Sequence, residues 1–152
     1  MKILLQRAQN VQVFLDGKKK CEFQIGVVCF VGFHKDDQED GLAWAIRKLL
    51  SLLLWNSDDG KPWKKCISDV DGGILLVHDS YMNASVETPN SPTLENAMSE
   101  QLSKIWYDKL IQKISCQYKL DHVFAQPFGE KLKIDFFNDG PLTIIIDSFN
   151  RK

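Results

Sequence analysis

The chain has 152 residues, 44% hydrophobic and 26% charged, which is the composition of an ordinary globular protein and predicts a single domain over residues 1–152. Its 19 Lys and Arg residues balance 20 Asp and Glu residues, which argues against a strongly basic, sequence-independent nucleic-acid coat. Four cysteines and three histidines are dispersed without ligand spacing, so we expect no metal and free buried thiols. The N-terminus turns polar too soon for a signal peptide and the apolar runs are short, so we expect a cytoplasmic chain with no membrane segment.

The first third of the sequence predicts strands. Apolar residues alternate with polar ones up to Leu15, and Asp16-Gly17 is typical of a hairpin turn. Residues 21–25 continue the strand pattern. Residues 26–33 are apolar throughout, as expected for a strand that is covered on both faces.

A helix is predicted to begin near Asp36, because Asp36 and Glu39 have the spacing of a capping box. One apolar stripe follows at helical period and consists of Leu42, Ile46, Leu49, Leu50 and Leu53. Residues 58–62 then form a turn, and residues 74–77 predict another buried strand.

The second half continues with a loop over residues 83–93, which contains Pro89 and Pro92 and is long enough to suggest a function. A second helix is predicted over residues 94–118, with Met98, Leu102, Ile105, Leu110 and Ile114 facing inward. Two final strands, 131–137 and 142–147, are expected to be joined by a turn at 138–141. This order of elements predicts an α+β fold, in which two main helices pack on a mixed sheet.

The segment Asn138-Asp139-Gly140-Pro141-Leu142-Thr143 has two interpretations. The first is a plain hairpin turn, since these residue types dominate turns for steric reasons. The second rests on Gly140-Pro141, because a cis peptide bond costs far less before proline than elsewhere. Such a step would present bare backbone that binds an ammonium group and leaves no room for a substituent on one side of the neighbouring carbon. That surface would select chirality by exclusion.

The segment His78-Asp79-Ser80-Tyr81 offers a base, a carboxylate and two hydroxyls in four residues. Adjacent strand residues point to opposite faces, so His78 and Asp79 are not expected to converge as a Ser-His-Asp triad requires. The alternative is a set of polar residues at the end of a strand.

Two basic clusters, residues 18–20 and 61–65, are interpreted first as solvated turns. The second is the better candidate for contact with phosphates or bases, because Trp63 lies among its lysines and an aromatic ring can stack on a base. His34 and His122 show no partner in the sequence and are interpreted as surface or packing residues.

Several short segments along the chain carry a family resemblance. In chain order they are Leu5-Gln6-Arg7-Ala8, Val11 to Gly17, Gly26-Val27-Val28 with Gly32, Lys48 to Leu52, Asp59-Gly60-Lys61, Asn90-Ser91-Pro92, Ala97-Met98 and Phe128-Gly129. The segment Asn138 to Thr143 fits the pattern Asn-x-Gly-Pro-x-Thr in full. Together they resemble the D-aminoacyl-tRNA deacylases, which are dimeric hydrolases that remove D-amino acids from tRNA. The tryptophan at position 63 is similar to eukaryotic members.

The resemblance implies the fold of this family, with a barrel-like sheet, and a homodimer whose active sites are completed across a two-fold interface. The backbone at Asp79, Ser80 and Tyr81 would bind the ester and perform the chemistry. Residues expected at the substrate, the 3′ end of aminoacyl-tRNA, are Gly140, Pro141, Asn138, Thr143, Arg7, His78, Met82, Asn90, Pro92 and Leu94. Gly140 and Pro141 would enter from the partner subunit and exclude L-amino acids, and Arg7 would hold their loop. No metal or organic cofactor is implied.

The family's second motif, Ser-Gln-x-x-Leu, falls on His78-Asp79-Ser80-Tyr81-Met82, where only the last position keeps its character. Asp79 adds a negative charge near the tRNA end, and Tyr81 fills space. Backbone N–H groups can stabilise an oxyanion whatever side chains they carry, so the altered motif is compatible with catalysis. We therefore expect hydrolysis of D-aminoacyl-tRNA, and of glycyl-tRNA by the same steric logic. The alternatives are an inactive paralogue that serves as a nucleic-acid-binding or adaptor dimer, and a hydrolase of another ester.

Overall fold

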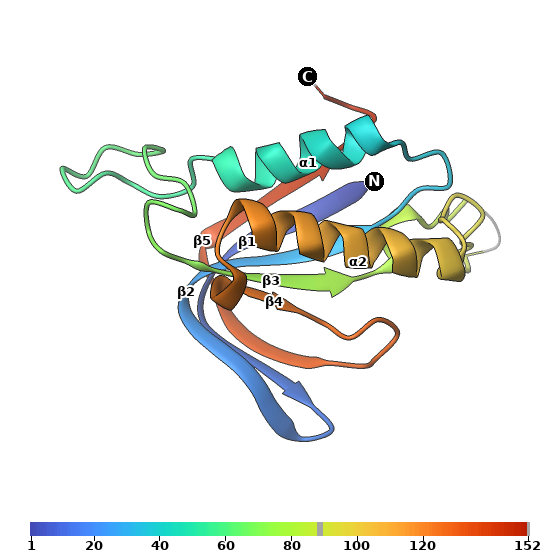
Figure 1. The fold of residues 1–152 in the computed structure, drawn as a ribbon, viewed down its shortest axis with the longest axis horizontal. Helices are drawn as coiled ribbons and strands as arrows, with labels where there is room; N and C mark the ends of the chain where they lie inside the picture. The colour runs from blue at the N-terminus through green and yellow to red at the C-terminus, as the bar shows by residue number, and fades with distance from the viewer. Residues whose placement is uncertain (88–89, 152) are drawn as a thin grey trace.

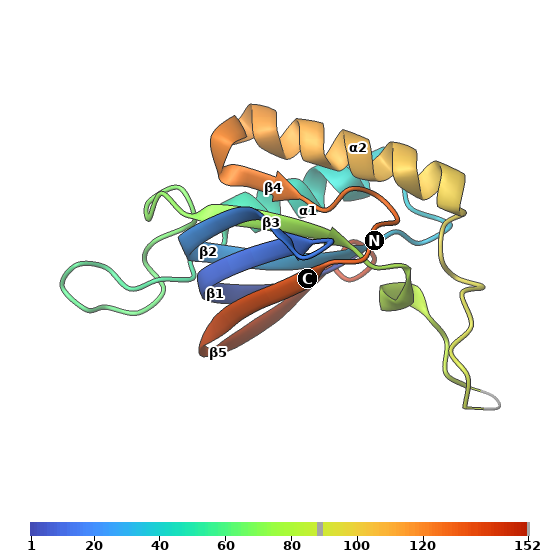
Figure 2. The ribbon, with the colours of Figure 1, turned by 90° about the horizontal axis from the view of Figure 1, so that it is seen from below.

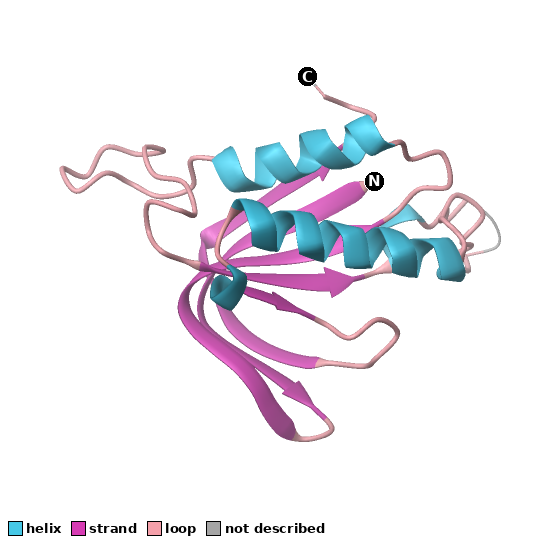
Figure 3. Ribbon diagram, in the orientation of Figure 1, coloured by secondary structure: helices cyan, strands magenta, loops and turns pink. Residues whose placement is uncertain are grey.

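The computed structural model describes residues 1–87 and 90–151 (Figure 1). Its strands are β1 (Lys2–Leu15), β2 (Lys18–Gly32), β3 (Gly73–His78), β4 (Val123–Ala125) and β5 (Lys133–Asp147). Its helices are α1 (Glu39–Ser51) and α2 (Glu100–Gln117), with two short 3₁₀ segments, η1 (Ser80–Asn83) and η2 (Leu120–His122). The chain therefore has the predicted mixture of helices and strands (Figure 3).

The five strands form one mixed sheet in the order β4-β3-β2-β1-β5. β1 is antiparallel to β2 and β5, whereas β3 is parallel to β2 and β4. The predicted turn between β1 and β2 is confirmed, and Asp16 and Gly17 both have positive φ, as a two-residue hairpin turn requires. Both α-helices lie on the same face of the sheet (Figure 2), so the predicted α+β class is confirmed.

Two apolar clusters pack against the sheet. The larger lies beneath the helices and includes Leu5, Val27, Leu42 and Tyr107. The smaller lies on the other face and draws side chains from both edge strands, including Phe124 of β4 and Phe136 of β5. Because residues of the two edges meet in one cluster, the sheet curls into an open, barrel-like shape.

The predicted start of α1 is wrong by one turn. The helix begins at Glu39, and its N-cap residue Gln38 makes no side-chain capping bond. Asp36 instead turns toward His34, whose Nδ1 accepts the Asp36 backbone N–H. The neighbouring Asp37 is buried and accepts a hydrogen bond from the α-ammonium group of Met1. A long-range ion pair therefore sets the path of the chain into α1.

The predicted start of α2 and its inward face also need correction. The helix begins at Glu100 rather than 94, and Leu102 and Ile105 are 42% and 62% exposed. Its buried residues are Ser103, Tyr107, Leu110 and Ile114, which share a face at helical spacing. In α1 the predicted stripe holds except for Leu53, which lies beyond the helix and is exposed. No helix among the described residues is long and apolar enough to cross a membrane.

The two strands predicted near the C-terminus form a single strand, β5, and the turn predicted between them does not reverse the chain. Both halves of β5 continue antiparallel along β1. Between the pairs Gln6↔Thr143 and Ala8↔Asn138, β1 advances by two residues and β5 by five, so β5 has a surplus of three residues. These residues protrude as a loop from the middle of the strand. The short strand β4 was not predicted from the sequence.

All four cysteines have free thiols, as predicted, but only Cys29 is buried and Cys116 is exposed. The expectation of buried thiols therefore holds at one position. Within residues 1–87 and 90–151, no three His, Cys, Asp or Glu side chains are grouped so that they could hold a metal ion.

Candidate functional site

The protruding loop of β5 presents bare backbone at Gly140 and Pro141. Both residues are exposed, and the peptide bond between them is cis. Gly140 has a φ of +135°, a region that residues with a side chain rarely adopt. A Cβ at this position would lie 3.0 Å from the backbone nitrogen of Leu142. The loop therefore needs a glycine for its own conformation, apart from any contact with a ligand.

Arg7 on β1 holds this loop from one side. Its Nε donates to the backbone carbonyl of Asp139 at 3.0 Å and lies 2.9 Å from Asp139 Oδ2. Its Nη1 donates to the carbonyl of Leu54, in the segment that follows α1. One guanidinium thus joins the loop of β5 to the segment after α1.

Asn138 and Thr143 close the loop from within. Asn138 Oδ1 accepts the backbone N–H of Leu142 at 2.8 Å, and Asn138 Nδ2 donates to Thr143 Oγ1 at 3.4 Å. Thr143 Oγ1 also accepts from Gln6 Nε2 at 3.2 Å. The first and last residues of the motif therefore stabilise the conformation of the loop.

A cavity of about 410 Å³ opens at the carboxyl end of β3. His78 contributes from the end of β3, Ser80 from η1, and Leu94 from the segment before α2. The remaining lining comes from Ala97 to Glu100 and from Phe128-Gly129. Of the predicted site residues, the structure brings His78, Ser80 and Leu94 together here.

The His78 ring is held among aromatic side chains. Its centroid lies 4.4 Å from that of Phe128, 5.7 Å from that of Tyr107 and 6.2 Å from that of Phe33. Burial lowers the pKa of His78, partly opposed by the carboxylates of Asp79 and Glu100. The imidazole is therefore neutral near pH 7.

The polar residues after His78 do not form a catalytic triad, in agreement with the prediction that His78 and Asp79 would diverge. Asp79 Oδ1 accepts the backbone N–H of Tyr81 at 2.9 Å and so caps η1. The Tyr81 side chain is exposed, and Met82 packs near Gly32. Ser80 lines the cavity, and its backbone N–H donates to no acceptor in the part of the chain that the structure describes.

Asn90 and Pro92 do not line the cavity, although Leu94 does. Both are exposed on a loop whose arms pair at Ser85 and Thr93. Pro89, also predicted in this loop, lies outside the described residues. The structure therefore leaves Asn90 and Pro92 beside the site rather than in it.

The Gly140-Pro141 loop is remote from the cavity of its own chain. Arg7, beside the loop, pairs with Val27, which pairs with Ile74, four residues before His78 on β3. The loop belongs to β5, which is three strand spacings from β3. At about 3.3 Å per residue and about 4.8 Å between strands, the loop and His78 are separated by roughly 13 Å along the sheet and roughly 14 Å across it. The predicted site residues thus form two separate groups within one chain.

The basic cluster around Trp63 is partly neutralised. Lys61 pairs with Asp59 at 2.7 Å, and Lys65 pairs with Asp58 at 2.5 Å. Trp63 itself is 52% exposed. In the other cluster Lys19 pairs with Glu22, which agrees with a solvated turn. Trp63 therefore remains available for stacking on a base.

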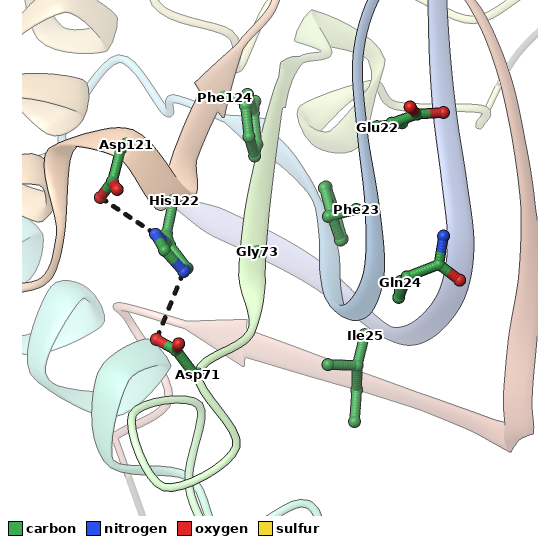
Figure 4. Close-up of a pocket in the computed structure, with 9 residues that line it drawn as sticks. All are labelled: Glu22, Phe23, Gln24, Ile25, Asp71, Gly73, Asp121, His122 and Phe124. Carbon is green, nitrogen blue, oxygen red and sulfur yellow. Dashed lines mark hydrogen bonds and ion pairs between the residues drawn. The ribbon is translucent and has the colours of Figure 1, made fainter.

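A second cavity, of about 300 Å³, lies at the amino ends of β3 and β4. Figure 4 shows the His122 ring there between two carboxylates, with Nδ1 3.0 Å from Asp121 Oδ1 and Nε2 3.3 Å from Asp71 Oδ1. The sequence showed no partner for His122, and the structure pairs this partly buried ring with Asp71 and Asp121. His34 also has partners, since it pairs with Asp36 and its ring meets that of Phe149 edge to face.

Several residues that line the cavity at the end of β3 or surround His78 were not among the predicted site residues. Phe128 stacks on His78, Tyr107 packs behind it, and Glu100 lines the opening. Phe128-Gly129 was among the segments that resemble the family, but no function was assigned to it from the sequence. Tyr107 was not among the residues predicted to face inward, although it lies three residues before Leu110 on the same buried face of α2.

The chain is similar to known proteins over almost its whole length. The family model for D-Tyr-tRNA(Tyr) deacylase matches residues 4–147. A D-aminoacyl-tRNA deacylase of Finegoldia magna is 35% identical, with 97% of this chain and 98% of that protein covered. One of Plasmodium falciparum is 34% identical, with 96% and 89% covered.

Two solved structures share the fold. One, titled c-Myc DNA Unwinding Element Binding Protein, is similar with a TM-score of 0.91 at 25% identity, and 97% of this chain and 98% of that chain are covered. The other, titled a probable eukaryotic D-amino acid tRNA deacylase, has a TM-score of 0.75 at 15% identity, with 95% and 97% covered. The predicted fold is therefore confirmed over almost the whole chain.

Proposed function

The chain belongs to the D-Tyr-tRNA(Tyr) deacylase family, and on this basis we propose that it hydrolyses the ester bond of D-aminoacyl-tRNA. Water adds to the ester carbonyl, the bond to the ribose oxygen breaks, and free D-amino acid and tRNA are released. The observation that carries the proposal is the Gly140-Pro141 loop, which is exposed and held by Arg7. We further propose that the protein is a single domain that acts in the cytoplasm without a metal or organic cofactor.

The loop supports selection by chirality. Gly140 has no side chain, so its backbone can approach the α-carbon of a bound amino acid closely. A substituent that points toward this backbone, as in an L-amino acid, would collide with it, whereas the hydrogen of a D-amino acid fits. Glycyl-tRNA carries no substituent on either side and is accepted by the same rule.

The altered motif at residues 78–82 is compatible with catalysis by backbone groups. The Ser80 N–H has no acceptor among the described residues, and Ser80 lines the cavity of about 410 Å³. A free, fixed N–H is the kind of donor that stabilises the negative charge developing on an ester oxygen. We assign this role to the Ser80 backbone, with Asp79 and Tyr81 holding η1 in place.

We infer a homodimer because one chain cannot bring the loop and its own cavity together. A second copy related by a two-fold axis would insert Gly140 and Pro141 into the cavity. The sheet face away from the helices carries a row of apolar residues, in which Ile145 pairs with Leu4 and Leu4 with Phe30. Ile145 is 63% exposed, so this row offers an apolar surface to a second copy.

A second candidate function is nucleic-acid binding without hydrolysis. It is favoured by the similar structure titled c-Myc DNA Unwinding Element Binding Protein and by the side chains at 78–81, which depart from the deacylase motif. The near balance of basic and acidic residues weakens it.

The deciding experiment is hydrolysis of D-tyrosyl-tRNA beside L-tyrosyl-tRNA and glycyl-tRNA, with the purified chain at increasing concentration. Loss of the D-ester and of the glycyl ester, with the L-ester spared, supports the proposal. A folded dimer that cleaves none of the three but retains tRNA or DNA would favour the second candidate.

A further inference from the structure

The segment that follows α1 forms a short arm, residues 54–65, that is closed at its base. The backbone N–H groups of Leu54 and Trp55 donate to the Lys65 carbonyl at 2.9 and 3.1 Å. Beside this base, Trp63 has a φ of +56° and a side chain that is 52% exposed. A left-handed backbone is rare for a bulky residue, and residues held in this way are concentrated where ligands bind. The arm therefore holds an exposed aromatic ring in a defined position.

Cationic side chains without an acidic partner lie on the arm and on the end of α1 next to it. Arg47, Lys48 and Lys64 are exposed and make no ion pair with any described residue. Arg47 and Lys48 also line an open cavity of about 550 Å³ that Ser51 and Gln117 border at the C-terminal ends of the two helices. The negative end of the α1 dipole amounts to about half a charge, so these cations outweigh it. Free cations beside an exposed aromatic ring are suited to the phosphates and bases of a nucleic acid.

The arm is fastened to the Gly140-Pro141 loop. Arg7 donates to the carbonyl of Leu54 at the base of the arm and to the carbonyl of Asp139 in the loop. Trp63 is two residues from the strand-like pairing that closes the arm, so its Cα lies at most about 7 Å from that pairing. Wherever the loop is inserted, the arm is therefore carried to the same place.

The arm and the cavity at the end of β3 lie at opposite ends of one chain. Figures 1 and 2 both show the segment after α1 beyond one end of the sheet and the carboxyl end of β3 at the other. The helix α2 runs between these ends, from Glu100, which lines the cavity, to Gln117, and its 18 residues span about 27 Å. In the proposed dimer, by contrast, the Gly140-Pro141 loop enters the partner's cavity and brings the arm to the rim of that cavity.

We propose that the arm binds the acceptor stem of the tRNA whose 3′ end lies in the cavity of the partner subunit. This inference rests on the proposed deacylase function and its dimer. One chain supplies the cavity for the ester, and the other supplies both the loop and the arm. Trp63 stacks on a base at the end of the stem, while Lys64 and the cations of α1 contact phosphates. Because Arg7 links the arm to the loop, binding of the stem also holds the loop against the amino acid.

The test uses heterodimers that are purified through two different tags. The arm variant carries Trp63→Ala and Lys64→Ala, and the cavity variant Ala97→Trp fills the cavity that Ala97 lines. Loss of the stacked base corresponds to about tenfold or more in affinity, so the arm homodimer should cleave D-tyrosyl-tRNA at least about tenfold more slowly than the wild type. The loss should be absent on D-tyrosyl-adenosine, which has no stem. In the heterodimer of the two variants, the open cavity meets the intact loop and arm of the other chain, so about half of the wild-type rate on tRNA should return.

The reverse pairing combines a wild-type chain with a chain that carries all three substitutions. Its open cavity meets the defective arm, so cleavage of tRNA should stay at least about tenfold below that of the first heterodimer. Both heterodimers contain the same substitutions, so a general loss of stability would affect them alike. Lys18→Ala is the control for charge, because it removes a cation without an ion pair among the described residues from the turn between β1 and β2, and it should cleave tRNA as the wild type does. If heterodimers with Ala97→Trp do not fold, Leu94→Trp obstructs the same cavity from a residue that is 41% exposed.

The outcomes separate this inference from the deacylase function. Recovery in the reverse pairing and not in the first heterodimer would show that the arm serves its own chain's cavity, which refutes the inference. An arm homodimer that cleaves tRNA as fast as the wild type would also refute it, because the arm would then not contact the stem. In both cases the deacylase function stands. If the wild type cleaves neither D-tyrosyl-tRNA nor D-tyrosyl-adenosine, the deacylase function itself fails.

Discussion

Replacing Arg7 tests whether a single guanidinium holds the chirality loop. In Arg7→Met the Leu54 carbonyl, in a residue that is only 2% exposed, loses its donor, which costs about 1–3 kcal/mol. Loss of the hydrogen bond to the Asp139 carbonyl adds about 1 kcal/mol. The partly exposed ion pair with the Asp139 carboxylate adds at most about 1 kcal/mol. We therefore expect the free energy of unfolding to fall by about 2–5 kcal/mol.

Urea unfolding measures this loss, and hydrolysis of D-tyrosyl-tRNA measures its effect on the site. Because the loop is no longer fixed, kcat/KM for D-tyrosyl-tRNA should fall by at least about tenfold. The assay is run without urea, where the variant is still folded, so that loss of folded protein does not account for the fall. Asp139→Asn is the matched control, since it removes the ion pair but leaves the backbone carbonyl that Arg7 binds. If Asp139→Asn loses as much as Arg7→Met, or if Arg7→Met loses less than about 0.5 kcal/mol, the tether is not where we place it.

Four further changes test other parts of the proposal. Gly140→Ala places a side chain at a φ of +135°, so it should lower stability by about 1–3 kcal/mol and abolish cleavage of D-esters; an active, stable variant would contradict the assigned loop geometry. Ile145→Lys should give an inactive monomer by sedimentation, and an active monomer would refute the shared site. Joint replacement of Trp63 and Lys64 by alanine should weaken cleavage of full-length tRNA but not of a D-aminoacyl-adenosine; equal loss on both would exclude a contact with the tRNA body. The folded state lowers the pKa of His78, so the unfolded state binds more protons and stability should fall as pH drops below 6.5; His78→Phe should lose less over this range than the wild type, and parallel curves would disprove the assignment.

Local patterns in the sequence predicted most of the sheet. The alternation before Asp16-Gly17 gave β1 and the hairpin, because strand period and turn chemistry are both short-range properties. The uninterrupted apolar run in β2 and residues 74–77 marked the buried centre for the same reason. The start of α1 was missed because Asp37 pairs with Met1, a contact over 36 residues that no local pattern reveals.

The candidate site was predicted in part. The loop at 138–143 could be found because of its Gly140-Pro141 step and its fit to the family pattern, but its turn chemistry suggested a reversal that pairing with β1 prevents. His78 was placed correctly at the end of a strand. Its aromatic enclosure could not be predicted, because Phe128 and Tyr107 come from distant segments of the chain.

The single long strand β5 also limits how this protein can change in length. The loop has fixed ends, since residues on both sides of it pair with β1. Removing or adding one residue between Asn138 and Thr143 would either alter the loop itself or shift the register that follows it by one. Such a shift would turn Ile144 and Ile146 out of the larger core. Surface loops normally tolerate insertions, but an insertion in this loop should disrupt either the fold or the candidate site. Natural variants of this chain should therefore differ in the residue types of this loop before they differ in its length.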